Sequence, residues 1–136
     1  MVKEICKDVF FLSKKAEPAT KDDMQVAIDL LDTLKANREC CVGLAANMIS
    51  SNKAVIAVNM GSFDVAMFNP KILSKKRPYE AEESCLSLSG TRKTTRYEEI
   101  EAEYQDMNFE TRRSKYTGFI AEIILHETNH NRGIII

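Results

Sequence analysis

The only two histidines of the chain lie four residues apart, and a glutamate follows the first, giving His126, Glu127 and His130. This is the H-E-x-x-H pattern, in which two imidazoles one helical turn apart bind a single metal ion and the glutamate serves as a base. The alternative is a helix that carries these residues by chance. Because both histidines would continue the apolar face of that helix, the sequence favours a metal centre.

Helical spacing indicates where the side chains around this pattern point. Four residues at steps of four, three and four share one stripe of a helix: Phe119, Ile123, His126 and His130. The two imidazoles are therefore expected to face the interior. Glu127 is rotated by about 100° from His126, so its carboxylate flanks the ion and does not bind it. That is the place for a general base that acts on a metal-bound water.

The pattern lacks one ligand, because a catalytic site of this kind usually has three protein ligands and one open position. Only the residues NRGIII follow His130, and they include no Asp, Glu, His or Cys. The third ligand must therefore lie upstream or on another chain. Because the chain has no third histidine, this ligand must be a cysteine or a carboxylate.

Cys85 is the favoured third ligand. It lies in EESCLSLSG, a short apolar run bounded by polar residues, which predicts a strand or a tight loop. A thiolate suits a borderline-soft metal that also binds two imidazoles. Burial as a small apolar residue is the alternative. Cys40 and Cys41 are rival ligands, and Cys6, near the start of the chain, is the weakest candidate.

Two helices are predicted to position these residues. Thr20 is a cap for a helix that begins near Lys21, and apolar residues recur at helical spacing through residues 22–38. The helix with the H-E-x-x-H pattern is predicted over residues 119–131 and is closed by Gly133.

The segments between the helices indicate strands. These are predicted over residues 53–60, ending at Gly61, over residues 65–70, ending at Pro70, and over residues 98–107, with a partner strand that ends near Tyr116. In the third strand, apolar residues alternate with glutamates, which is typical of a half-buried antiparallel strand. The predicted fold class is α+β, with an N-terminal helix and mostly antiparallel strands packed around the C-terminal H-E-x-x-H helix.

Composition predicts a single domain that spans residues 1–136. Apolar residues make up 44% of the chain and charged residues 29%, which is ordinary for a globular protein. The net charge is −1, so no strong field attracts nucleic acid or a membrane. We therefore expect neither sequence-specific nucleic-acid binding nor membrane association.

The lack of a recognisable targeting signal and the pattern of cysteines predict a cytoplasmic protein. The first residues, MVKEICKDVF, contain neither a long apolar stretch nor a small-residue cleavage site. Apolar stretches such as AVIAV are too short to cross a bilayer. The four cysteines, two of them adjacent, do not form the spacing of a disulfide framework. Reduced thiols are the expected state.

Three motifs, in this order along the chain, resemble those of the polypeptide deformylase family: G-L-A-A at residues 43–46, E-x-C-L-S at residues 83–87 and H-E-x-x-H at residues 126–130. The resemblance covers nearly the whole chain and identifies it as a divergent member. It implies an α+β hydrolase that removes the formyl group from the N-terminal methionine of nascent polypeptides. Formyl-methionyl peptides or nascent chains are the implied partners, with ribosome association as a further option, and the oligomeric state stays open.

The resemblance also implies a cofactor and catalytic roles. The cofactor is one divalent metal ion per chain, Fe²⁺ in the cell, with Zn²⁺, Ni²⁺ or Co²⁺ able to occupy the site. Cys85, His126 and His130 hold this ion, and metal-bound hydroxide attacks the formyl carbon. Glu127 takes a proton and passes it to the leaving amine. The backbone N–H of Leu86 donates to the formyl oxygen as it becomes negative.

The peptide-binding residues are implied in the same way. Gly43, Leu44 and the strand around Leu86 line the main chain of the peptide, and Ile123 helps to hold the methionine side chain. Met48 belongs to the same substrate-binding set. Two arginines resemble those beyond the cysteine loop of the family, with ordinary surface charge as the alternative: Arg92 and Arg96.

Met48 is the main departure from the family pattern. After G-L-A-A the family has x-Gln, whose side chain donates to the oxyanion, whereas this chain has Asn47 and Met48. Met48 has no donor, and losing one such donor typically costs about 10²–10³ in rate. Asn47 is expected to point elsewhere. Residues 133–136 are expected to add at most a short strand, and smaller departures occur at five positions: Cys41, Ser84, Leu125, Asn129 and Asn131.

Three functions follow from these residues. The first is an active deformylase, of reduced rate or altered specificity. The second is a deformylase-like protein of weak or no activity that binds formylated or nascent peptides. The third is another metal-dependent amidase or peptidase. The complete ligand set and Glu127 favour the first function, whereas Met48 favours the second.

Overall fold

The computed structural model describes residues 1–134, apart from the side chains of Leu88 and Ser89. Its elements are, in chain order, α1 (Val9–Leu12), the 3-10 helix η1 (Lys21–Asp23), α2 (Met24–Ala36), β1 (Gly43–Ala45), the 3-10 helix η2 (Ala46–Ile49), β2 (Val55–Asn59), β3 (Asp64–Cys85), β4 (Leu88–Gln105), β5 (Thr111–Thr117) and α3 (Gly118–Asn131). The predicted α+β class is confirmed. In the described part of the chain, no helix is long and apolar enough to cross a membrane.

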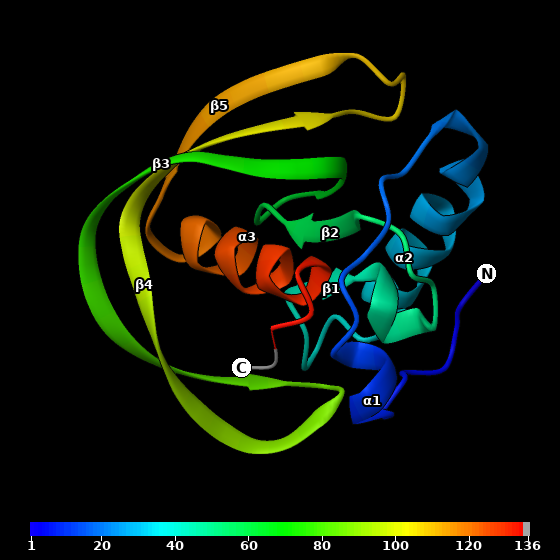
Figure 1. Cartoon of the computed structure of the whole chain (residues 1–136), viewed down its shortest axis with the longest axis horizontal. Coiled ribbons are helices and arrows are strands. Elements are labelled where there is room, and N and C mark those ends of the chain that lie inside the picture. Colours follow the sequence, from blue (N-terminus) through cyan, green and yellow to red (C-terminus); the bar gives the residue numbers. More distant parts are fainter. Residues whose placement is uncertain (135–136) are drawn as a thin grey trace.

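The strands form a sheet in the order β1-β2-β3-β4-β5, and each neighbouring pair is antiparallel. The long strands β3 and β4 bend around α3 (Figure 1). Helix α3 packs on β1, β2, β4 and β5, whereas α2 packs on β2 and β3. The curved sheet therefore wraps the helix that carries the H-E-x-x-H pattern.

The first long helix begins with the predicted cap. The Thr20 hydroxyl accepts a hydrogen bond from the backbone N–H of Asp22, and the Asp23 carboxylate accepts one from the N–H of Thr20 at 2.8 Å. This capping box starts the 3-10 helix η1, and the α-helix follows from Met24. The buried residues of α2 recur at helical spacing, as predicted: Ala27, Asp29, Leu30, Thr33 and Leu34.

The predicted strand end at Pro70 is wrong, because β3 continues through Pro70 to Cys85. The register of β3 against β4 shifts between Phe68 and Lys71. At such a bulge, a residue without a backbone N–H breaks no ladder hydrogen bond. The neighbouring Asn69 adopts a φ of +52°, which bends the strand so that its second half can continue toward α3.

The rest of the chain follows the sequence more closely. Strand β4 begins at Leu88, earlier than predicted, and its second half buries Ile100 and Ala102 as the alternation indicated. Strand β5 and helix α3 lie where predicted, and Gly133 follows the helix with a φ of +76°. The short strand expected over residues 133–136 falls partly on residues 135 and 136, outside the described residues.

Candidate metal centre

Helix α3 holds both histidines inside the molecule. His126 is 7% exposed and His130 is 1% exposed. Their ring centroids lie 5.1 Å apart, as expected for residues one helical turn apart on one face. The helix is buried from Ala121 onward, except at Glu122 and Asn129, so packing against the sheet holds the helix face that carries the two rings.

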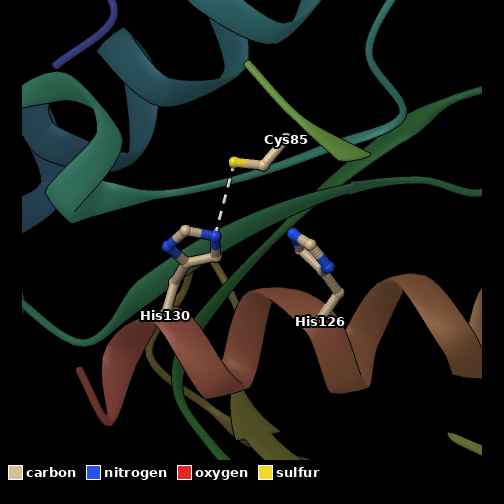
Figure 2. A group of neighbouring side chains, drawn as sticks. All are labelled: Cys85, His126 and His130. Atoms are coloured by element: carbon tan, nitrogen blue, oxygen red, sulfur yellow. Dashed lines mark hydrogen bonds between the residues drawn. The ribbon is translucent and has the colours of Figure 1, made fainter. Parts of the chain in front are cut away.

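Cys85 reaches these rings from the opposite wall. It is the last residue of β3, and the two-residue turn that follows leads into β4. Its Sγ atom lies 3.4 Å from Nε2 of His130, and the ligand atoms of Cys85, His126 and His130 all lie within 4.8 Å of one another. Figure 2 shows the sulfur pointing toward the side of α3 that carries the two rings.

This donor set fits a divalent metal ion. Metal–nitrogen bonds of about 2.0–2.1 Å and a metal–sulfur bond of about 2.3 Å place tetrahedral ligand atoms about 3.3–3.6 Å apart. The observed separations require only small side-chain movements. Within the described residues, the rival thiols of Cys6, Cys40 and Cys41 belong to no comparable group. The Cys41 thiol instead donates to the Gly43 carbonyl at 2.9 Å.

Glu83 and Arg96 orient one of the rings. Nδ1 of His126 lies 2.7 Å from Oε1 of Glu83, and Arg96 donates two hydrogen bonds of 2.9 and 2.7 Å to the same carboxylate. Glu83 is 8% exposed and Arg96 is 2% exposed. A carboxylate on Nδ1 leaves Nε2 of His126 for a metal. Ordinary surface charge is therefore the wrong interpretation of Arg96, whereas Arg92 lies at intermediate exposure.

Sequence reasoning gave Glu83 no role, although a signal was available. Glu83 and Cys85 are two residues apart on β3, and strand alternation places such residues on the same face. An acidic residue two positions before a cysteine ligand is thus a candidate partner for a nearby imidazole. Its pairing with Arg96 across the β3–β4 hairpin depends on the sheet register and could not be foreseen.

The charged groups of this cluster shift one another's pKa values. Burial opposes a charge on His126, but the carboxylates of Glu127 and Glu83 outweigh it and raise the pKa of His126 to about 10. Burial alone would raise the pKa of Glu83, yet hydrogen bonds from His126 and Arg96 lower it to about 2. Burial and the charged His126 lower the pKa of His130 to about 3. The neighbouring carboxylates thus favour a charged His126 ring, whereas burial beside that ring favours a neutral His130 ring.

Glu127 is buried in the site with one unpartnered carboxylate oxygen. It is 4% exposed, and its Oε1 atom has no hydrogen-bond partner among the described residues. Burial raises the pKa of Glu127 to about 7, which suits a group that both accepts and donates protons near neutral pH. A Cβ atom on Gly43 would lie 2.6 Å from Cγ2 of Ile123 and 3.0 Å from Oε2 of Glu127. Glycine is therefore required at this close approach.

A cavity of about 330 Å³ opens onto these residues. Four residues assigned to substrate contact by the family resemblance line it: Gly43, Met48, Leu86 and Ile123. Leu44 does not line the cavity, because its side chain is fully buried in the core. A role for the Leu44 backbone stays a prediction.

Met48 lies beside the cysteine sulfur. It is 1% exposed, and its Sδ atom is 4.0 Å from Sγ of Cys85 and accepts a hydrogen bond from the Ala45 N–H at 3.4 Å. Asn47 points elsewhere, as expected, because its Nδ2 atom donates to the His130 carbonyl at 3.0 Å. Neither side chain offers the cavity a hydrogen-bond donor.

Comparison with known proteins identifies the family. The sequence model of polypeptide deformylases matches residues 2–136. The chain belongs to the polypeptide deformylase family. The peptide deformylase of Clostridium beijerinckii is 56% identical over 136 residues, the full length of both chains. That of Dictyoglomus turgidum is 32% identical over 125 residues, which cover 91% of this chain and 80% of that protein.

Solved peptide deformylases share the fold. The enzyme from Thermotoga maritima matches with a TM-score of 0.89 at 26% identity, covering 99% of this chain and 95% of that chain. A class I type b peptide deformylase from Acinetobacter baumannii with Met-Ala-Ser bound matches with a TM-score of 0.88 at 27% identity, covering 99% and 97%. The predicted family, fold and enzyme class are confirmed. Peptide deformylases are metalloenzymes, and this chain holds a group of residues able to bind a metal.

Proposed function

We propose that this chain removes the formyl group from the N-terminal formyl-methionine of nascent polypeptides in the cytoplasm, with residues 1–136 acting as one unit. One observation carries the proposal: the donor atoms of Cys85, His126 and His130 converge within 4.8 Å of one another, beside a cavity lined by the buried and unpartnered Glu127. The relative with Met-Ala-Ser bound supports a methionyl peptide as the occupant of that cavity.

Cys85, His126 and His130 would hold one divalent ion, Fe²⁺ in the cell, with Zn²⁺, Ni²⁺ or Co²⁺ as substitutes. When bound, such an ion supplies Lewis-acid activation of water and of the formyl oxygen. Glu83 keeps Nδ1 of His126 occupied at 2.7 Å, so that the opposite nitrogen is presented to the ion.

Glu127 would move the protons of the reaction. Its carboxylate accepts a proton from the attacking water and then donates it to the nitrogen of the leaving amine. The bond between the formyl carbon and this nitrogen breaks, which yields formate and a free N-terminus. The backbone N–H of Leu86, in the turn directly after Cys85, would donate to the formyl oxygen as it becomes negative.

Met48 lowers the expected rate, because it gives that oxygen no side-chain donor. The second candidate function, a deformylase-like protein that binds formylated or nascent peptides with weak or no turnover, rests on this residue. Glu127 favours turnover, because binding alone has no chemical need for a buried base beside the donor cluster.

The test is formate release from formyl-Met-Ala-Ser by iron-loaded protein that was purified without oxygen. Glu127→Ala is the control, with metal content and circular dichroism showing that the variant is folded and loaded. Wild type should release formate and the variant should not. If neither wild type nor Glu127→Ala releases formate, the enzyme function is contradicted and peptide binding remains as the candidate function. Internal cleavage of unblocked peptides would instead indicate a peptidase.

A further inference from the structure

Met48 places a second sulfur beside the donor cluster. Its Sδ atom lies 4.0 Å from Sγ of Cys85, and both side chains line the cavity together with His126 and Glu127. A thioether has no hydrogen to donate, but its sulfur is a ligand for soft metal ions. Met48 is therefore able to bind a metal ion, although it cannot donate to an oxyanion.

The separation of the two sulfurs fits two bonds to one ion. Metal–sulfur bonds of about 2.3 Å that meet at the tetrahedral angle place two sulfurs about 3.8 Å apart. A longer thioether bond, of the kind that methionine forms in copper sites, increases this separation. The observed 4.0 Å between Sγ of Cys85 and Sδ of Met48 lies in that range, so coordination requires no large movement of either side chain.

The contacts of the Cys85 thiol indicate on which side of its sulfur an ion would lie. Sγ lies 3.4 Å from Nε2 of His130 and donates a hydrogen bond to Sδ of Met48 at 4.0 Å. A bound ion takes the place of the thiol proton, which is released to solvent. The ion would then lie between Sγ and these two atoms, so the Met48 sulfur faces it.

The fold holds Met48 in this orientation. Met48 belongs to the 3-10 helix η2 and is 1% exposed. Its carbonyl accepts a hydrogen bond from the Cys6 N–H at 2.7 Å, and its Sδ atom accepts one from the Ala45 N–H at 3.4 Å. The contact with Ala45 occupies one lone pair of the sulfur and leaves a second for an ion.

The resulting donor set is soft. One thiolate, two imidazoles and a methionine thioether are the ligands of copper in electron-transfer proteins, and thiolate and thioether ligands select Cu⁺. We propose that Met48 is a fourth ligand and that it makes Cys85, His126, His130 and Met48 a binding site for Cu⁺. This inference rests on the metal centre of the proposed deformylase function and extends it to a second ion.

The two ions would have opposite effects on activity. Fe²⁺ is harder and gains little from a thioether, so the iron form keeps its open position for water. Cu⁺ held by four protein ligands has no open position, as in a closed structural site. The copper form should therefore release no formate.

X-ray absorption at the copper edge tests the ligand count directly in protein loaded with Cu⁺ without oxygen. Wild type should show two sulfur neighbours of copper, and Met48→Leu should show one. Met67→Leu is the matched control, because Met67 is fully buried in β3 and lies outside the cavity lining. It should keep both sulfurs. One sulfur in wild type, or two in Met48→Leu, would overturn the inference.

Competition with a chromophoric Cu⁺ chelator gives a second readout. Loss of an outer partner of a metal ligand typically weakens metal affinity by about 10- to 100-fold. Loss of the direct ligand in Met48→Leu should therefore weaken Cu⁺ binding by about tenfold or more, whereas Co²⁺, a harder ion, should bind wild type and variant alike. Unchanged Cu⁺ affinity, or an equal loss for Co²⁺, would overturn the inference.

Neither measurement needs turnover, so the two proposals can fail separately. Formate release from formyl-Met-Ala-Ser by iron-loaded protein, together with a single sulfur on copper, would overturn the Met48 ligand alone. Two sulfurs on copper, in protein that releases no formate when loaded with iron, would support the Met48 ligand and contradict the proposed function alone.

Discussion

At the inner end of the cavity, His126, Glu83 and Arg96 are each at most 8% exposed and are joined by three contacts of 2.7–2.9 Å. At the outer end, Val42 and Phe119 are 39% and 61% exposed. The inner end thus combines the donor cluster with buried charged side chains that hydrogen-bond to one another. The apolar side chains of the outer end are partly exposed to solvent.

The difference shows which positions tolerate change. A buried carboxylate that loses one partner keeps a charge that nothing balances, which destabilises the fold. Single substitutions in the inner cluster should therefore be costly. Replacing a half-exposed side chain at the outer end costs the protein little stability. Cys85 and the H-E-x-x-H residues are retained at the inner end, where Met48 is the main departure from the family pattern. Substitutions at the two ends should therefore differ in size and in kind.

The largest effect is expected from Cys85→Ala at the inner end. Removal of one of three protein ligands should reduce bound metal from about one ion per chain to near none and lower formate release by about 10³-fold or more. Metal analysis and formate release measure both. Cys41→Ala is the matched control, because the Cys41 thiol donates a hydrogen bond to the Gly43 carbonyl and lies outside the donor cluster. One tightly held ion in Cys85→Ala would refute the ligand assignment.

Met48→Gln should have the next largest effect, in the direction of gain. An amide at this position would give the formyl oxygen a donor, and one such donor is worth about 10²–10³ in kcat. Met48→Leu keeps the apolar volume without a donor and should stay at the wild-type rate. If glutamine brings no gain over leucine, the oxyanion does not form beside residue 48.

Glu83→Gln should weaken metal binding by about 10- to 100-fold, because the partner that orients His126 loses its charge. Competition with a chromophoric chelator measures this affinity. Glu80→Gln, an exposed change on the same strand, is the control and should bind metal like wild type. Unchanged affinity in Glu83→Gln would show that packing alone orients the His126 ring.

The same variant should change the acid stability of the metal-free protein. Hydrogen bonds from His126 and Arg96 outweigh burial and lower the pKa of Glu83 from 4.5 to about 2. A lowered pKa in the folded state means that this stabilisation is complete above about pH 4.5 and is lost as the pH falls toward 2. Urea midpoints of wild type and Glu83→Gln should therefore differ most near neutral pH and converge as the pH falls from about 4.5 toward 2. A gap that widens in acid would show the opposite sign.

The smallest effect is expected at the outer end. Phe119 is 61% exposed, so Phe119→Ala should change the free energy of unfolding by only about 0.5 kcal/mol or less. It should raise KM for formyl-Met-Ala-Ser a few-fold and leave kcat and metal content unchanged. If Phe119→Ala lowered kcat as much as an inner-end variant does, the division between an inner end for turnover and an outer end for substrate binding would be wrong.

Much of the inner end could be foreseen from the sequence. His126, Glu127 and His130 are neighbours on one helix, so their relative placement depends on local geometry that any helix imposes. The capping residues of the first long helix and the alternation that buries Ile100 and Ala102 are local in the same way. Cys85 was chosen among four cysteines because the motif lacked a ligand, and the family resemblance supported that choice.

The tertiary structure decided what lies across the sheet. The shift in β3 at Pro70 allows one strand to reach from Asp64 to Cys85, and a proline had predicted its end. Glu83 meets His126, 43 residues away, and Arg96 joins them from β4. Tyr79 meets Glu122, also 43 residues away. Such contacts depend on strand register and on the curvature of the whole sheet, which no short stretch of sequence encodes, because each arises only when distant segments pack together.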